Sequence, residues 1–288
     1  MEREGGLIAP LHVYTGFGNT VAVTDQKSKE YMACYTDGQR HKPNALMPIS
    51  RKGEKMIEML NMDCMEYMAG CADKAFELAI VDPPYGIGMH KTHFETKSSK
   101  SKASEYGEKK WDVRAPDENY FNELRRISKN QIIWGANHFI SKIPFDSSCW
   151  VVWDKDNGGS LHADCELAYT SFETSVRRFK YTWHGMRQEN MKNKEHRIHP
   201  TQKPVALYKW LLSRYAKPGD RIIDTHGGSG SICIACHDLG FDLTWMELDT
   251  DYYAAACKRY KDHAAQAVLF EPQEIIQKTY NNEFDLTS

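Results

Sequence analysis

The sequence predicts an α/β fold, in which short buried strands alternate with helices. Three observations favour this class. An apolar run over 76–81 stops abruptly at an acid and two prolines. Residues 221–247 have the pattern of a strand, a glycine-rich loop, a helix and a second strand, which is typical of α/β folds. The chain has 288 residues, enough to bury a sizeable core as one domain or as one domain with an insertion.

Short apolar runs predict buried strands, and longer runs with a 3.6-residue period predict helices. The strand over 76–81 must end at Pro83, because proline cannot donate a hydrogen bond to a neighbouring strand. Turn residues over 156–159 and 217–220 separate further elements. In chain order we expect strand 56–62, helix 64–71, strand 76–81, helix 120–127, strands 131–137, 150–154 and 166–172, a helix that opens at 199–204 and ends at 215, strand 221–224, helix 232–239, strand 242–247 and helix 252–267.

The composition divides the chain into three parts. Residues 1–52 contain several glycines and prolines and lack sustained periodicity, so we expect a poorly ordered or small accessory extension with one short strand at 21–23. Residues 53–270 carry the periodic segments and form the main domain, with a basic insert at about 173–200. Residues 271–288 are a polar tail.

Charge and cysteine content exclude several classes of protein. Hydrophobic residues make up 41% of the chain and charged residues 26%, as in ordinary globular proteins. The eight cysteines are scattered and do not form a secreted disulfide framework. There is no amino-terminal signal sequence and no apolar run near the membrane-spanning length of about 18 residues. We therefore expect no membrane partner and a reducing cytoplasm.

The net charge of −2 does not by itself indicate a nucleic-acid partner, so basic residues would have to act locally. Residues 176–203 contain eight Lys or Arg against two Glu, with Tyr181 and Trp183 among them. Basic residues interleaved with aromatic ones suit phosphate contacts and base stacking. A solvated basic face is the plain alternative. Residues 91–110 add a polar loop with six Lys against three Glu.

The stretch Asp82-Pro83-Pro84-Tyr85 follows a predicted strand, and ligands of open α/β sheets bind at the carboxyl ends of strands. The Asp82 carboxylate and the Pro83 carbonyl are two acceptors that can hold the two hydrogens of an exocyclic amine. Tyr85 offers a flat face on which a heterocycle can stack. A strand that ends in a proline turn without function is the alternative interpretation.

Residues 221–247 have the form of a nucleotide-binding unit. Gly228 and Gly230 let the backbone approach a ligand closely, and Glu247 can accept both hydroxyls of a ribose. This reasoning fits S-adenosylmethionine and dinucleotides alike. The strict dinucleotide fingerprint is absent, because Cys233 stands where its third glycine or alanine would be.

Taken together, these motifs resemble those of the amino-methylating DNA methyltransferases. Residues 82–85 resemble the catalytic motif of that family. Residues 224–231 resemble its Asp-Pro-Phe-x-Gly-Ser-Gly-Thr motif, with Thr225 and His226 in place of Pro and Phe. Residues 199–204 match its His-Pro-Thr-Gln-Lys-Pro motif without departure. The catalytic motif precedes the glycine loop, which is the order of the β class, and the resemblance covers about residues 56–262.

The resemblance implies a Rossmann-like, seven-stranded, mostly parallel sheet of the class I methyltransferase type, with a circularly permuted motif order and one antiparallel strand. Residues 53–270 would be the methyltransferase domain. Side by side, the strands would lie in the order 56–62, 242–248, 221–225, 76–82, 131–136, 166–172 and 150–154.

The resemblance also implies a site-specific enzyme that transfers a methyl group from S-adenosylmethionine to the N6 amine of adenine in double-stranded DNA. It would act as a monomer or homodimer in the cytoplasm of a prokaryotic cell or a phage-infected host. The implied catalytic residues are Asp82, Pro83, Pro84 and Tyr85. The implied cofactor residues are Asp63, Asp224, Gly228, Ser229, Gly230 and Glu247, together with Gln202 and Lys203 near the methionine carboxylate. The implied DNA-binding residues are Arg177, Arg178, Lys180 and Arg187.

Other functions stay open. Methylation of cytosine N4 fits the same two-acceptor argument, and in the family Asp before Pro-Pro-Tyr goes mostly with adenine and Ser mostly with cytosine. A few relatives methylate RNA or protein amides. A dinucleotide-dependent oxidoreductase would leave Asp82 and residues 199–204 without a role, and the intact motif disfavours a DNA-binding protein with a decayed site. The haem-like spacing Cys233-x-x-Cys236-His237 falls on a predicted helix, so we interpret these cysteines as core residues and expect no metal.

Overall fold

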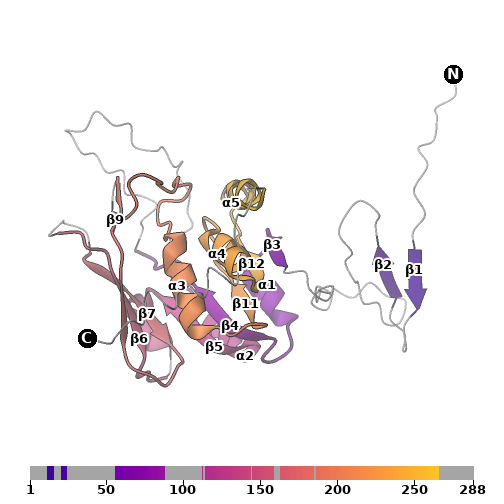
Figure 1. Cartoon of the computed structure of the whole chain (residues 1–288). Helices are drawn as coiled ribbons and strands as arrows, with labels where there is room; N and C mark the ends of the chain where they lie inside the picture. The colour runs from indigo at the N-terminus through magenta and orange to yellow at the C-terminus, as the bar shows by residue number, and fades with distance from the viewer. Residues whose placement is uncertain are drawn as a thin grey trace. The chain divides into compact units, whose positions relative to one another are not determined.

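The computed structural model describes residues 12–15, 21–24, 56–87, 112, 114–143, 145–158, 163–184 and 186–265 (Figure 1). The chain forms two compact units, one of Met1–Glu54 with Ala69–Cys71 and one of Lys55–Met68 with Ala72–Ser288. In the first unit, β1 (His12–Thr15) pairs antiparallel with β2 (Val21–Thr24). The strand expected at 21–23 is therefore present as β2. The predicted basic loop at 91–110 and the polar tail lie outside the described residues.

The second unit is built on an eight-stranded sheet. All neighbouring strands in it are parallel, except that β7 runs antiparallel to both of its neighbours, β5 and β6. The first seven strands of the sheet are those predicted, in the predicted order, and β7 is the one antiparallel strand. The spatial order is β3 (Ile57–Leu60), β12 (Asp242–Met246), β11 (Arg221–Asp224), β4 (Phe76–Val81), β5 (Ser128–Trp134), β7 (Cys165–Thr170), β6 (Trp150–Asp154) and β8 (Arg177–Lys180).

Strand β8 was not predicted, so the expectation of a seven-stranded sheet was wrong: the sheet has eight strands. It pairs in parallel with β6, with Trp153 opposite Phe179. Along β8 the half-buried and exposed positions alternate, and the Phe179 ring packs on Trp210 at 5.4 Å between ring centroids. Because three of its four residues are basic, the segment has the composition of a solvated loop. The alternation of apolar and polar residues that predicts a strand is therefore not visible in its sequence. The predicted basic insert therefore begins as part of the sheet.

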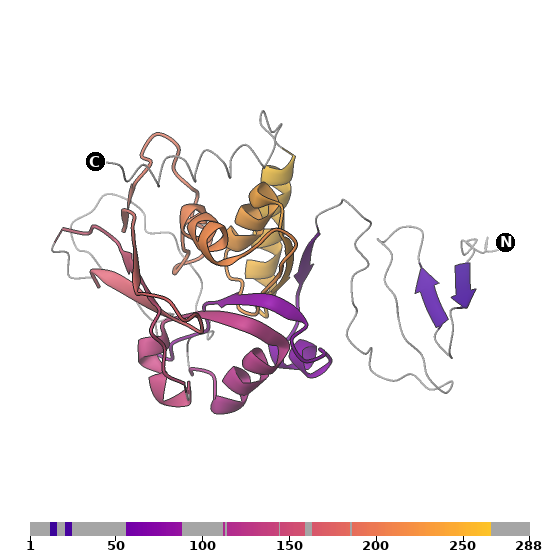
Figure 2. The same ribbon diagram turned by 60° about the horizontal axis from the view of Figure 1, so that its bottom comes forward.

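Helices cover both faces of the sheet, as Figure 2 shows: α3, α4 and α5, in orange and yellow, lie on one face, and α1 and α2, in purple and magenta, lie on the other. The predicted helices are all present, with boundaries that differ by a few residues. They are α1 (Cys64–Ala69), α2 (Glu118–Ile127), α3 (Val205–Tyr215), α4 (Ser231–Leu239) and α5 (Thr250–Ala264). Smaller elements are the 3₁₀ turns η2 (Ala136–His138) and η3 (Ile140–Lys142) and the antiparallel pair β9 (Trp183–His184) and β10 (Arg187–Gln188).

The sheet topology decides where functional side chains can meet. Strands β12, β11 and β4 are adjacent and parallel, so their carboxyl ends lie at one edge of the sheet. Asp82, Asp224 and Glu247 end or directly follow these strands, which brings three acids to that edge. Within the part of the chain that the structure describes, no helix is both long and apolar enough to cross a membrane.

Helix α2 covers the sheet beneath this edge through a buried stripe of Tyr120, Phe121, Leu124 and Ile127. This spacing of three and four residues places the four side chains on one face of the helix. The helix begins at Asp117, whose Oδ1 accepts a hydrogen bond from the Tyr120 amide at 3.2 Å. The cap satisfies one of the amide groups that have no partner in the first turn of a helix.

We expect the Asp117→Ala variant to lose about 1 kcal/mol of unfolding free energy, because the cap of α2 is removed. Urea unfolding followed by circular dichroism measures this loss. Glu118→Ala is the matched control: this exposed neighbour contributes only its favourable interaction with the helix dipole, typically about 0.3 to 1 kcal/mol. An Asp117→Ala variant with the unfolding free energy of the wild type would show that the cap contributes nothing.

Candidate active site

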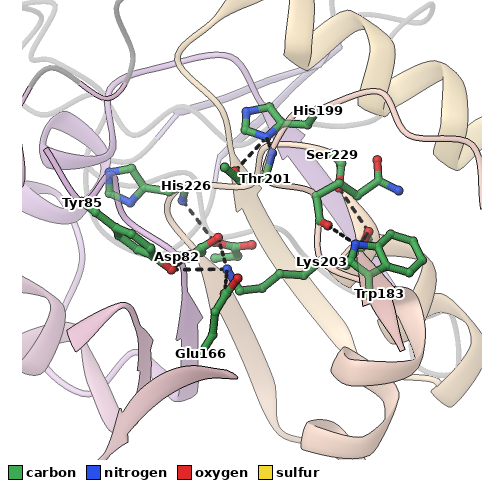
Figure 3. A network of polar contacts seen from close by, with 12 residues as sticks. Asp82, Tyr85, Glu166, Trp183, His199, Thr201, Lys203, His226 and Ser229 are labelled. Carbon is green, nitrogen blue, oxygen red and sulfur yellow. Dashed lines mark hydrogen bonds and ion pairs between the residues drawn. The ribbon is translucent and has the colours of Figure 1, made fainter. Parts of the chain in front are cut away.

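Asp82 directly follows β4, where the chain turns away from the sheet through Pro83 and Pro84. Its side chain is 18% exposed. The Tyr85 hydroxyl donates to Asp82 Oδ1 at 2.8 Å, and the Lys203 ammonium donates to Asp82 Oδ2 (Figure 3). Both carboxylate oxygens therefore already have a partner within the protein.

The Tyr85 ring packs against the turn that follows β5. It stacks on His138, with 4.8 Å between ring centroids and 16° between planes. Gly135, at φ 67°, leaves room for the ring: a Cβ there would lie 2.0 Å from Tyr85 Cε1. Burial, and next the charge of Asp82, hold the pKa of Tyr85 well above its ordinary value. The hydroxyl therefore keeps its proton and acts as a donor to Asp82.

Lys203 is the centre of a buried chain of alternating charges. Its side chain is 3% exposed, and its ammonium also lies 3.2 Å from Glu166 Oε2. The other oxygen of Glu166 pairs with Lys155. Burial alone would raise the pKa of Glu166, but the charges of Lys203 and Lys155 prevail and lower it to about 2. Burial would likewise lower the pKa of Lys203, yet Asp82 and Glu166 raise it, so Glu166 and Lys203 are both charged at neutral pH.

The loop between β11 and α4 has the geometry of a ligand cradle. Gly228 and Gly230 adopt left-handed conformations, at φ 52° and 68°. The amide of Gly228 donates to Glu247 Oε2, and the amide of Asp249 donates to Glu247 Oε1, each at 2.8 Å. Burial raises the pKa of Glu247. Each carboxylate oxygen has a second lone pair, so Glu247 can still accept hydroxyl groups of a ligand.

A tryptophan lies directly beneath this loop. A Cβ at Gly227 would lie 1.7 Å from Trp245 Nε1, so the backbone at this position rests on the indole. Trp245 is fully buried, and its Nε1 has no hydrogen-bond partner among the described residues. On the other side, the His199 ring lies 3.7 Å from where a Gly228 Cβ would be. The glycine backbone of the loop and an acid at the next strand end fit an adenosyl group.

The two positions that depart from the family motif take part in hydrogen bonds. The Tyr120 hydroxyl lies 2.7 Å from Thr225 Oγ1, which lies 3.0 Å from His226 Nδ1. Burial lowers the pKa of His226 to about 4, so the imidazole is neutral at pH 7. The Asp224 carboxyl accepts from the His226 amide at 3.1 Å. Burial, opposed by that hydrogen bond and supported by the nearby charges of Asp82 and Glu247, raises the pKa of Asp224 to about 8.

The structure brings most of the predicted catalytic and cofactor residues to one edge of the sheet, but it gives some of them structural contacts. Gln202 uses its amide to brace its own loop, accepting from the Ile198 amide at 3.0 Å and donating to the His196 carbonyl at 3.3 Å. The exposed Asp63 caps α1 by accepting from the Met65 amide at 2.7 Å. Ser229 is buried and its hydroxyl lies 3.1 Å from that of Ser231. The roles of these residues toward a ligand stay predictions.

The predicted DNA-binding residues lie apart from this network, because no contact that the structure describes joins them to Asp82. Arg178 and Lys180 are exposed on β8 and lie near acids, at 3.9 Å from Asp154 and 3.0 Å from Asp156 respectively. Such exposed pairs are weak, so both cations stay available to a stronger anion. Arg177 is half-buried on β8, and Arg187 is exposed on β10.

Sequence reasoning missed several residues that form the site. Glu166 and Lys155 lie next to Lys203, while His138 and Gly135 hold Tyr85. A single acid in the otherwise apolar start of a strand was the only signal for Glu166, and it is a weak one. Among the described residues, no group of three His, Cys, Asp or Glu side chains is arranged to hold a metal ion.

Comparison with known proteins finds similarity to DNA methylases. The family model for N6/N4 DNA methylases, described as DNA methylase, matches residues 159–258. The protein named "Putative methylase YubD" of Escherichia coli (strain K12) is 24% identical over 225 residues, which cover 71% of this chain and 90% of that protein. The type II methyltransferase M.HpaI of Haemophilus parainfluenzae is 33% identical over 67 residues, 23% of this chain and 21% of that one.

Solved structures of methyltransferases are also similar to the chain. A complex of M1.HpyAVI with SAM matches with a TM-score of 0.45 and 19% identity, over 71% of this chain and all of that chain. The cytosine-N4-specific PvuII DNA methyltransferase matches with a TM-score of 0.46 and 12% identity, over 79% of this chain and 93% of that chain.

Asp224 should make the stability of the ligand-free protein depend on pH. Because its pKa is about 8 in the folded state and ordinarily 3.8, the folded chain keeps a proton that the unfolded chain releases. The stability contributed by that proton is complete below pH 3.8 and is lost as the pH rises through about 8. Between pH 6 and 8 we expect the unfolding free energy of the wild type to fall relative to that of Asp224→Asn, by up to about 1.4 kcal/mol per pH unit.

Urea unfolding at several pH values measures this difference. Asp262→Asn, at an exposed position of α5, is the control and should keep the pH dependence of the wild type. Parallel pH profiles of the wild type and Asp224→Asn would mean that Asp224 is already ionised in the folded protein.

Proposed function

We propose that the chain, whose residues 159–258 match the family model of N6/N4 DNA methylases, transfers a methyl group from S-adenosylmethionine to the N6 amine of adenine in double-stranded DNA. One observation supports the proposal: β4, which Asp82-Pro83 directly follows, pairs in parallel with β11, which the glycine loop follows. An amine held by Asp82 and the Pro83 carbonyl would face a cofactor held by the loop.

The glycine loop fits S-adenosylmethionine, which supplies an electrophilic methyl group on its sulfonium. Glu247 would accept the ribose hydroxyls while its amide contacts to Gly228 and Asp249 keep the loop in shape. The left-handed Gly228 lets the backbone approach the ligand. The flat indole of Trp245 supports the loop from below.

The protein's own groups would activate the amine. An exocyclic amine is a poor nucleophile, because its lone pair is conjugated into the ring. Asp82 Oδ1 and the Pro83 carbonyl would each accept one amine hydrogen, which localises the lone pair and aims it at the methyl group. The acceleration would come from positioning and electrostatic preorganisation.

The contacts of Tyr85 would change when the base arrives. Its hydroxyl now donates to Asp82 Oδ1, so the incoming amine must either share this oxygen with the hydroxyl or replace it there. The ring then offers a face for the base, and stacking on an aromatic ring is worth about 1 to 3 kcal/mol per base. In a duplex the base must first leave the stack, at a cost of a few kcal/mol.

The choice of adenine over cytosine rests on the resemblance, in which Asp before Pro-Pro-Tyr goes mostly with adenine. The geometry around Asp82 accepts either amine. The exposed Arg178, Lys180 and Arg187 would contact phosphates of the bound duplex, which supplies affinity without sequence information.

We expect Asp82→Ala to abolish methylation while S-adenosylmethionine still binds within a few-fold of the wild-type affinity, because Asp82 holds the base. Long-read sequencing of DNA from cells that express the wild type or the variant reports the modified base and its flanking sequence. Asp73→Ala, at an exposed position before β4, is the control and should methylate normally. Modified cytosine in place of adenine would overturn the base assignment, and turnover by Asp82→Ala would overturn the mechanism.

Glu247→Ala should weaken the binding of S-adenosylmethionine by about 1.5 to 3 kcal/mol, the range for hydrogen bonds to a charged group. Isothermal titration calorimetry of the isolated protein measures this affinity. Asp242→Ala is the matched control, because Asp242 lies at the opposite end of β12 and binds the Met56 amide. Equal affinity in the wild type and Glu247→Ala would remove the ribose role.

A further inference from the structure

We propose that Lys203 and Glu166 are positioning residues for catalysis: Glu166 holds the Lys203 ammonium against Asp82, and the ammonium fixes the one carboxylate rotamer that can receive the amine. This inference rests on the proposed function and assigns a role to Glu166, which no sequence motif indicated. It also gives Lys203 a different role from the predicted contact with the methionine carboxylate.

Acceptors within the protein surround the ammonium. Lys203 donates to Asp82 Oδ2 and, at 3.5 Å, to the Tyr85 hydroxyl, and it forms an ion pair with Glu166 Oε2 at 3.2 Å. The Trp134 ring closes a further side, with its centroid 5.4 Å from the ammonium. A ligand carboxylate would have to displace one of these partners from a side chain that is only 3% exposed.

The arrangement distinguishes the two oxygens of Asp82. Oδ2 is bound by the buried ammonium, whereas Oδ1 is bound by the Tyr85 hydroxyl. Both hydrogen bonds end on the carboxylate and are charge-assisted, but only the ammonium adds the attraction of an opposite charge, so the hydroxyl is the weaker partner. Oδ1 is therefore the oxygen that becomes free for the amine, and Oδ2 stays fixed.

Lys203 is also the cation that supports the charge of Asp82. The described groups that respond to the charge of Asp82 are Tyr85, Tyr120, Tyr208, Asp224 and Lys203. Burial holds the pKa of the three tyrosines well above the ordinary value, so they are neutral, and Asp224 is an acid. Lys203 is the one cation in this set. Glu166 in turn keeps Lys203 in place, and Lys155 on the far side of Glu166 completes the chain of charges.

The test compares Lys203→Met and Glu166→Gln with the wild type in kcat, in KM for DNA and in calorimetric affinity for S-adenosylmethionine. We expect kcat to fall about 100-fold in Lys203→Met and about 10-fold in Glu166→Gln, because a misplaced catalytic group costs rates of this order. Cofactor affinity and KM should stay within about threefold.

The matched control is Asp238→Asn, which removes a part-buried ion pair with Lys209 on the helical layer and should leave kcat unchanged. A large loss of cofactor affinity with unchanged kcat would overturn the proposal and restore Lys203 to the methionine carboxylate. If Lys203→Met does not fold, the milder Glu166→Gln variant tests the proposal alone, and an unchanged kcat in that variant would overturn it.

A second readout does not depend on activity. Carbon-13 NMR of the side-chain carboxyls of the ligand-free protein follows the titration of Glu166, whose pKa of about 2 depends on Lys203 and Lys155. Its titration should move to higher pH in Lys203→Met and stay unchanged in Asp238→Asn. An unchanged titration in Lys203→Met would show that the pair does not form. A wild type that methylates no DNA, but shows this titration, would count against the proposed function and not against the ion-pair network.

Discussion

The site depends on one constraint, the parallel alignment of β12, β11 and β4 in the middle of the sheet. Parallel strands bring their carboxyl ends to the same edge, and the acids Asp82, Asp224 and Glu247 all lie at such ends. A ligand that binds there meets groups from segments more than a hundred residues apart in the chain, and no loop has to fold onto the site to bring them together.

The same constraint brings several acids close together in a partly buried region, where their negative charges repel one another. A different interaction offsets this repulsion at each acid. Asp224 holds its proton, with a pKa of about 8. Glu247 is bound by two backbone amides, and Asp82 and Glu166 share the ammonium of Lys203. The acids stay coupled all the same, because the charges of Asp82 and Glu247 help to raise the pKa of Asp224.

The sequence was sufficient for the parts of this fold that leave a local signal. Pro83 and Pro84 mark the end of β4, and the glycines after Asp224 mark the loop, so these two boundaries could be predicted from the residues. The order of the strands followed from the resemblance to the methyltransferase family. Strand β8 could not, because the basic residues Arg177, Arg178 and Lys180 hide its alternation. The contacts that hold the Tyr85 ring could not be predicted either. Gly135 leaves room for the ring and His138 stacks on it, and both contacts exist only in the folded chain. Gln202 was assigned to a ligand, whereas its amide is engaged by backbone groups of its own loop.

The reversed direction of β7 has a consequence for how such sites are found. Glu166 is the second residue of its strand, yet it lies with Asp82, which follows the end of β4. Because β7 runs antiparallel to its neighbours, its first residues lie at the same edge of the sheet as the last residues of the other strands. Lys155, which directly follows β6, also lies at this edge and pairs with Glu166. A search for functional residues that inspects only the ends of strands misses those on the reversed strand of a mixed sheet. In sequences with this topology, the first two positions of the reversed strand should be read together with the final positions of all the others.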